Sequence, residues 1–87
     1  MSLPPLTSAQ IRAARSLIRW SAEDLAARSA LSVATIRRAE LTGAETSITA
    51  ANDLAVRRAL EAAGVGFIDE NGEGAGVRIK SRSPKRL

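Results

Sequence analysis

Apolar side chains recur every three or four residues along most of this chain, which is the spacing of amphipathic helices. Four such stretches each follow a hydroxyl residue that can cap the first turn of a helix. The predicted helices cover residues 8–19, 22–29, 33–41 and 50–63, after Thr7, Ser21, Ser32 and Thr49 respectively. We expect the first helix to bury Ile11, Ala14, Leu17 and Ile18, and the fourth to bury Ala55, Val56, Ala59, Leu60 and Ala63.

The period of the pattern changes from helical to alternating after Gly64. Two short alternating stretches are typical of β-strands, and residues 69–72 between them form a turn signal. We therefore predict a β-hairpin whose apolar positions are Val65, Phe67, Val77 and Ile79. We interpret residues 6–80 as one domain and the polar, basic residues 81–87 as a disordered tail.

Composition excludes most catalytic chemistry. The chain of 87 residues contains no histidine, cysteine or tyrosine, so disulfides, thiolate or imidazole metal sites and histidine-activated nucleophiles are absent. The longest apolar run, residues 62–68, is far shorter than the roughly 18 residues that cross a bilayer. We expect a cytoplasmic protein that has no cofactor, no metal, no membrane partner and no enzymatic activity.

The formal net charge of +4 is unevenly distributed along the chain. Residues 1–40 carry six arginines and three acidic residues, and residues 41–76 carry two arginines and six acidic residues. Residues 77–87 carry five basic residues and no acidic one. Two basic zones on a small domain favour a polyanionic partner, nucleic acid before membrane, although solvated surface charge explains the same pattern.

The second and third predicted helices are short and are joined by a tight connection at residues 29–31. This is the layout of a helix-turn-helix unit, whose second helix enters the major groove of DNA. The inward residues of that helix are Val33 and Ile36, and the outward residues are Ala34, Arg37 and Arg38. Val33 and Ala34 can touch thymine methyl groups, and the two arginines one turn later can reach guanine or phosphate. Taken alone, the arginines would be solvated helix charges.

The chain resembles the lambda-repressor-like (Xre) helix-turn-helix regulators of bacteria and phages. The residues that carry the resemblance are Ile11, Arg12, Ala13, Ala14, Arg15, Trp20, Ser21, Leu25, Ala26, Ser32, Thr35, Ile36, Arg38, Glu40 and Gly43. Residues 59–72 and 76–79 are similar to the end of small four-helix members that finish in a hairpin. The resemblance implies an all-α fold, namely a lambda-repressor-like helix-turn-helix bundle with a C-terminal β-hairpin. It also implies a transcriptional regulator of the repressor type that binds double-stranded DNA in a sequence-specific manner as a homodimer.

The resemblance assigns a set of DNA-binding residues: Ser21, Ser32, Val33, Ala34, Thr35, Arg37, Arg38 and Thr42. By similarity, the positions that face the bases are Val33, Ala34, Arg37 and Arg38. Ser32 and Thr35 are implied to lie near the DNA backbone, and Thr42 where the following loop meets a phosphate. Ser21 precedes Ala22, a position at which the family usually has a glutamine that anchors a phosphate.

Several neighbouring residues have structural interpretations. We expect Glu40 to be an ion-pair or capping partner, and Trp20 to pack the first helix over the second rather than to stack on bases. The glycine-rich residues 72–76 precede no helix, so we expect a hairpin turn there rather than a phosphate cradle. Ala30 occupies the turn position at which the family commonly has glycine.

A regulator of this type needs two recognition helices about 34 Å apart on a near-palindromic operator. We therefore expect the homodimer to form through residues 65–80, with help from Leu54 and residues 56–60, and with the apolar residues of the hairpin buried between copies. The alternative, from another functional class, is an antitoxin- or adaptor-like module that binds a protein partner. Enrichment of one sequence from random duplex DNA distinguishes the two.

Overall fold

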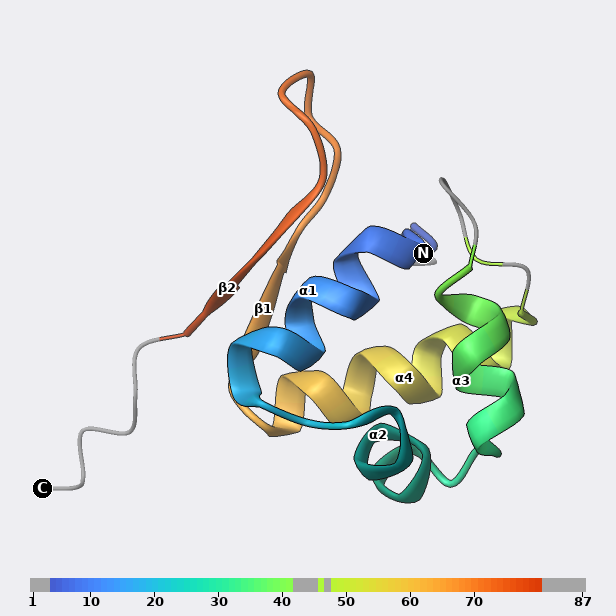
Figure 1. The fold of residues 1–87 in the computed structure, drawn as a ribbon. Helices are drawn as coiled ribbons and strands as arrows, with labels where there is room; N and C mark the ends of the chain where they lie inside the picture. The colour runs from blue at the N-terminus through green and yellow to red at the C-terminus, as the bar shows by residue number, and fades with distance from the viewer. Residues whose placement is uncertain (1–3, 42–45, 47, 81–87) are drawn as a thin grey trace, which may run out of the picture.

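The computed structural model describes residues 4–41, 46 and 48–80, and these residues form four helices followed by two strands (Figure 1). The elements are α1 (Ser8–Ile18), α2 (Ala22–Ser29), α3 (Val33–Ala39), α4 (Ala50–Ala62), β1 (Val65–Ile68) and β2 (Gly76–Ile79). All four helices begin at the predicted residue, and α1, α3 and α4 end one or two residues earlier than predicted. The predicted tail, residues 81–87, lies outside the described residues.

Hydroxyl caps start all four helices, as predicted. Each cap accepts the backbone N–H three residues ahead: Thr7 from Gln10, Ser21 from Asp24, Ser32 from Thr35 and Thr49 from Asn52. In α1 and α2 the side chain of that third residue also accepts the backbone N–H of the cap residue, which completes a capping box. Both of these helices end on a residue in the left-handed conformation, Arg19 (φ 60°) and Ala30 (φ 61°). Local sequence signals therefore account for where each helix starts.

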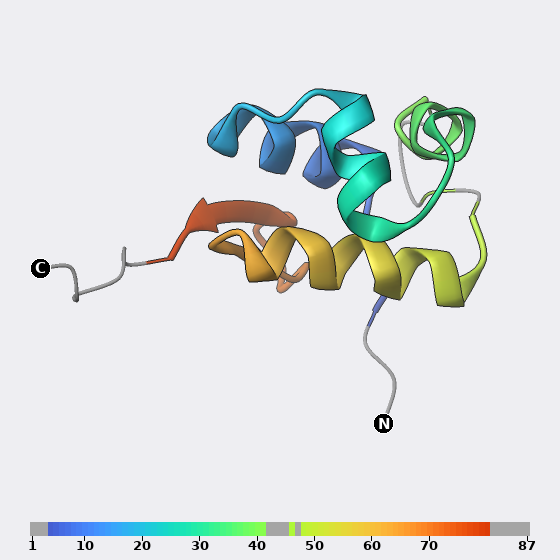
Figure 2. The same cartoon turned by 90° about the horizontal axis from the view of Figure 1, so that it is seen from below.

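One apolar core joins the helices and the first strand. Its most buried members are Leu6, Ile11, Ala14, Leu25, Ala26, Ile36, Ala39, Val56, Leu60 and Val65. Figure 2 shows α4 along one side of the molecule, with α1, α2 and α3 on the other and β2 between α1 and α4. Leu17 was expected in this core and is 39% exposed. The inward stripe of α1 follows Ile11, Ala14 and Ile18, so Leu17 lies one position away from it.

Two charged residues of α4 are buried, which the apolar pattern did not predict. The carboxylate of Asp53 accepts the backbone N–H of Leu6 at 3.1 Å. The guanidinium of Arg57 donates to the carbonyl of Pro4 at 2.9 Å and lies 5.2 Å from the centre of the Phe67 ring. Buried charges are stable only with such partners. These bonds fix the segment that precedes α1 against α4.

The hairpin is part of the core, and the predicted all-α, lambda-repressor-like fold class is therefore wrong. The strands pair antiparallel, with Val65 opposite Ile79 and Phe67 opposite Val77. Val65 is fully buried, and Phe67 and Val77 pack against the core. The alternating pattern turns one face of the hairpin toward α1 and α4, so the helices alone do not complete the core. The molecule is a small helix bundle completed by a C-terminal antiparallel hairpin.

Gln10 fastens the hairpin to α1. Its Nε2 donates to the carbonyls of Ile68 and Gly76, at 3.1 and 3.0 Å, and these two residues lie opposite each other in the strand register. Its Oε1 accepts the N–H of Thr7 at 2.9 Å. One buried amide thus serves both the cap of α1 and the end of the strand pair.

Candidate functional site

The connection between α2 and α3 is three residues long and is fixed by hydrogen bonds. Ala30 is left-handed, and the N–H of Leu31 donates to the carbonyl of Ala26 at 3.0 Å. The hydroxyl of buried Ser29 donates to the carbonyl of Leu25 at 2.7 Å. Leu31 itself packs against the core. These contacts hold α3 in one orientation against α2, at the end of the molecule away from the hairpin (Figure 1).

Helix α3 has one buried face and one exposed face. Ile36 and Ala39 are fully buried. Ala34, Arg37 and Arg38 are exposed, and their spacing of three and four residues places them on one side of the helix. The predicted outward positions of α3 are confirmed.

Val33 lies between the two faces of α3. It is half-buried and packs against the core, as the inward prediction required. Ala34, its neighbour in the first turn, is exposed. Of the two residues predicted to touch thymine methyl groups, Ala34 is therefore the more accessible.

The two arginines of α3 have different surroundings. Nη2 of Arg37 lies 2.9 Å from Oε2 of Glu23 on α2, and both side chains are about 60% exposed (62% and 61%). Water screens such a pair, which contributes only about 0.2–1 kcal/mol. Arg38 is exposed and has no hydrogen-bond or ion-pair partner among the described residues. Among the described residues, therefore, no side chain competes with a ligand for the Arg38 guanidinium.

The predicted hydroxyl contacts are occupied in helix caps. Oγ of Ser21 accepts the N–H of Asp24 at 3.0 Å, and the Asp24 carboxylate accepts the N–H of Ser21 at 2.9 Å. Oγ of Ser32 accepts the N–H of Thr35 at 3.1 Å and lies 2.9 Å from Oγ1 of Thr35. The Asp24 carboxylate repels a phosphate at the start of α2, so Ser21 is a weaker candidate than Ser32. Thr42 lies outside the described residues.

An ion pair with a residue of α1 supports the C-terminal end of α3. Glu40 follows α3 and accepts two hydrogen bonds from the guanidinium of Arg15 on α1, at 2.7 and 2.8 Å. Arg15 also donates to the carbonyl of Trp20 at 2.8 Å. The hydrogen bond to Glu40 is the main cause that raises the pKa of Arg15, against the opposing effect of burial. The structural role predicted for Glu40 is confirmed, whereas no sequence signal identified its partner on another helix.

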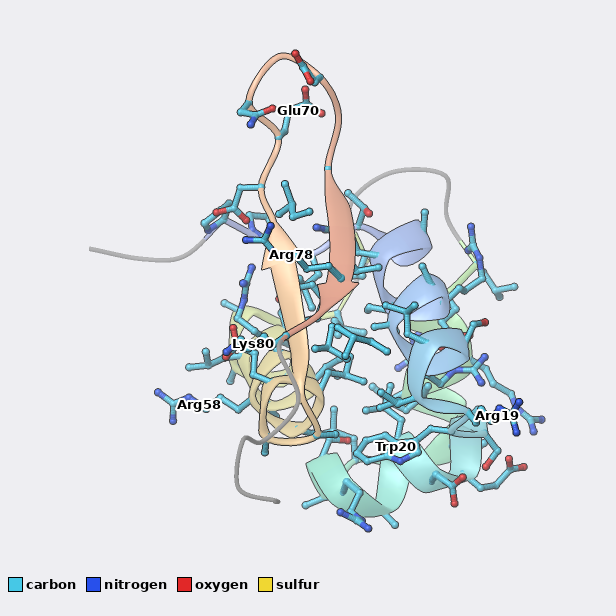
Figure 3. The ribbon with its side chains drawn as sticks, turned by 90° about the vertical axis from the view of Figure 1, so that its left-hand side faces the viewer. Arg19, Trp20, Arg58, Glu70, Arg78 and Lys80 are labelled. Atoms are coloured by element: carbon cyan, nitrogen blue, oxygen red, sulfur yellow. The ribbon has the colours of Figure 1, made fainter. Side chains whose placement is uncertain are left out.

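Trp20 lies at the connection between α1 and α2 (Figure 3). It is half-buried and packs against the core, and the guanidinium of Arg28 lies 5.2 Å from the centre of its ring. The predicted packing role of Trp20 is confirmed.

A second group of basic side chains lies on the hairpin side of the molecule. Arg58 of α4 joins Arg78 and Lys80 there, and all three are exposed (Figure 3). None of the three has a carboxylate partner among the described residues. The Lys80 side chain runs past Gly66, where an added Cβ would come 3.3 Å from the Cγ of Lys80. The sequence predicted a basic zone at residues 77–87 but not that Arg58 lies on the same side.

Other functional features are few in the part of the chain that the structure describes. No group of three acidic side chains comes together there as a candidate metal site, and no helix there is long and apolar enough to cross a membrane. No known protein family matches the sequence, and no curated protein matches it.

Proposed function

We propose that the protein is a cytoplasmic transcriptional regulator that binds double-stranded DNA in a sequence-specific manner through α3. The observation that carries the proposal is the exposed face of this helix. That face offers a small side chain, Ala34, in the first turn and two long donors, Arg37 and Arg38, one turn later. The opposite face is fixed in the core by Ile36 and Ala39.

Each part of this face suits the major groove. A groove about 12 Å wide admits one α-helix, and a small residue near the start of the helix lets the backbone approach the base edges. The methyl group of Ala34 can lie against a thymine methyl. An arginine guanidinium donates two parallel hydrogen bonds to O6 and N7 of guanine. Arg38, which has no partner among the described residues, is the best candidate for this contact.

The rigid connection between α2 and α3 supports the same function. Because Ala30, Leu31 and Ser32 are already hydrogen-bonded, presenting α3 to DNA requires little additional ordering. The sequence of this unit also resembles that of the lambda-repressor-like regulators. This resemblance supports a helix-turn-helix role for α2 and α3, but it does not support the fold class. The proposed mechanism is occupancy of an operator, which excludes or recruits polymerase without a chemical reaction.

Selection from a pool of random duplexes, followed by binding measurements at one fixed salt concentration, tests this proposal. We expect one enriched sequence. Replacing Arg37 and Arg38 together with Ala should weaken its binding at least about tenfold, because the loss of one base contact costs about 1–3 kcal/mol and a second cation at the DNA surface is lost as well.

The matched control for that experiment replaces Arg58 and Arg78 with Ala. It removes the same charge from the hairpin side of the molecule and should change affinity for the selected duplex far less. An equal loss in both double variants would show that binding depends on charge alone and would contradict readout by α3. Absence of any enriched sequence would favour the alternative function, a protein-interaction module.

A further inference from the structure

The outer edge of β2 pairs with no further strand among the described residues. The sheet there has two strands, of which β1 packs against α4 and β2 packs against α1. The N–H of Lys80 donates to the carbonyl of Gly64 at 2.8 Å, so this pair is of the hydrogen-bonded type. Hydrogen-bonded and non-hydrogen-bonded residue pairs alternate along two antiparallel strands. The N–H and C=O groups of Val77 and Ile79 therefore point away from β1, toward the outer edge.

Side chains along this edge remain accessible. Ile79 is 51% exposed although its partner Val65 is fully buried, and Arg78 is exposed on the other face. An edge with unpaired backbone groups and a half-exposed apolar residue is a template for another strand. The prediction that Val65 and Phe67 are buried between copies is wrong, because both pack in the core of their own copy. Any association therefore depends on the backbone edge and its charges.

We propose that β2 pairs antiparallel with β2 of a second copy of this chain, about a two-fold axis. A register centred on Val77 joins the outward backbone groups and places Arg78 opposite Gly76 of the second copy. A register centred on Arg78 would place two guanidinium groups opposite each other, which is unfavourable. The Val77-centred register is therefore the one we assign, with Ile79 hydrogen-bonded to Ala75 of the second copy.

Charge complementarity selects a second copy as the occupant. The loop between the strands carries Asp69, Glu70 and Glu73, all exposed, and lies at the opposite end of the hairpin from Lys80 (Figure 3). Antiparallel pairing brings the loop of one copy beside the C-terminal end of β2 in the other. Lys80 then lies opposite Gly74, next to Glu73 of the second copy, and the two-fold axis repeats this contact.

Glu73 is the most suitable acidic residue for this contact. The Glu70 carboxylate already accepts the N–H groups of Gly72 and Gly74, at 3.1 and 3.0 Å, and so organises the loop. The Glu73 side chain has no hydrogen-bond partner among the described residues. Its substitution therefore tests association without disturbing the loop.

Sedimentation equilibrium in the absence of nucleic acid tests the interface, so the outcome is independent of the proposed function. Wild-type protein should be in monomer–dimer equilibrium. Glu73→Lys and Lys80→Glu should each weaken the dimer at least about tenfold, since each places like charges at both symmetric contacts. An equimolar mixture of the two variants should restore a heterodimer, because both contacts then join opposite charges. Arg58→Glu, the same change on the same side but off the edge, should leave the dimer intact.

A second variant tests the backbone pairing. Ile79→Pro removes an N–H that points away from β1, so it breaks no ladder bond within the copy. We expect a folded monomer by circular dichroism, whereas Ile79→Ala, which keeps the N–H, should weaken the dimer less. A monomeric wild-type protein, or a dimer unaffected by Ile79→Pro, would overturn the proposal. Failure of the two charge variants to form a heterodimer would also overturn it.

Discussion

Two neighbouring arginines on α3 carry most of the proposed chemistry, and a single carboxylate distinguishes them. Glu23 holds Arg37 toward α2, whereas Arg38 is unpaired among the described residues. We infer that Arg38 reads a base and that Arg37 contacts the phosphate backbone.

The corresponding prediction separates the two roles by single substitutions. Arg38→Ala should cost about 1–3 kcal/mol at the selected duplex and relax the preference at one base pair. Arg37→Ala should weaken all sequences by a similar factor and reduce the slope of log K against log salt by about 0.9. Fluorescence anisotropy with the selected duplex and its single-base-pair variants measures both. Full discrimination retained by Arg38→Ala would contradict the assignment.

Glu23 provides a second prediction at this scale. Glu23→Gln should raise DNA affinity several-fold at low salt, because it removes a charge that repels phosphate and releases the Arg37 guanidinium. The gain should be smaller in an Arg37→Ala background, since part of it acts through that residue. Binding isotherms of the four proteins in this double-mutant cycle give the coupling. An unchanged or lowered affinity would show that Glu23 does not limit the availability of Arg37.

At the scale of elements, the junction between α2 and α3 depends on an alanine in an unfavourable conformation. Ala30 has a φ of 61°, where a side chain costs about 1–2 kcal/mol and glycine costs little. Ala30→Gly should raise the free energy of unfolding by about 0.5–1 kcal/mol. This is less than the strain that it relieves, because glycine also makes the unfolded chain more flexible. The control Ala27→Gly, an exposed position inside α2, should lower it by about 1 kcal/mol. Urea unfolding measures both, and destabilisation by Ala30→Gly would contradict the account of this turn.

The attachment of the hairpin to α1 gives another prediction. Gln10→Glu keeps an oxygen that can accept the N–H of Thr7. It replaces the amide donor with a carboxylate oxygen, which cannot donate to the carbonyls of Ile68 and Gly76 and is repelled by them. It should lower the free energy of unfolding by about 2 kcal/mol at neutral pH, the cost of buried groups without partners. The difference from wild type should shrink near pH 4, because the protonated carboxyl can again donate one hydrogen bond. A variant as stable as wild type at neutral pH would show that the Gln10 amide does not hold the hairpin.

Local sequence signals predicted the elements because their causes are local. The caps Thr7 and Ser21 act within three residues, and the alternation around Val65 distinguishes a strand from a helix. The exposed face of α3 followed from helical periodicity for the same reason. The partnership of Arg15 with Glu40 spans 25 positions and depends on how two helices pack, so no local pattern reveals it. Burial of Asp53 depends likewise on the distant backbone of Leu6.

The error in fold class has a related cause. The hairpin was identified correctly from its alternating residues, but its apolar side was assigned to a second copy. Packing of β1 against α4 and the bonds from Gln10 make that side part of the core. Whether an amphipathic hairpin covers its own helices or another chain is decided by tertiary packing, which periodicity does not encode.

For the whole molecule, the two proposed surfaces lie apart. Figure 1 places α3 at one end and β2 at the other, and the extents of one copy are 40 × 33 × 25 Å. Pairing through β2 therefore leaves the exposed face of α3 accessible in both copies. Binding of both helices to one near-palindromic operator requires that they lie about 34 Å apart, or a multiple of that distance.

The measurement that tests the central claim most directly replaces guanines of the selected duplex, one at a time, with 7-deazaguanine. This base pairs normally but lacks the N7 acceptor in the major groove. We expect one position in each half-site at which the substitution weakens wild-type binding about tenfold, a loss of about 1.4 kcal/mol. The same substitution should leave the affinity of Arg38→Ala unchanged. If no position is sensitive, or if both proteins lose affinity equally, Arg38 on α3 does not read the major groove.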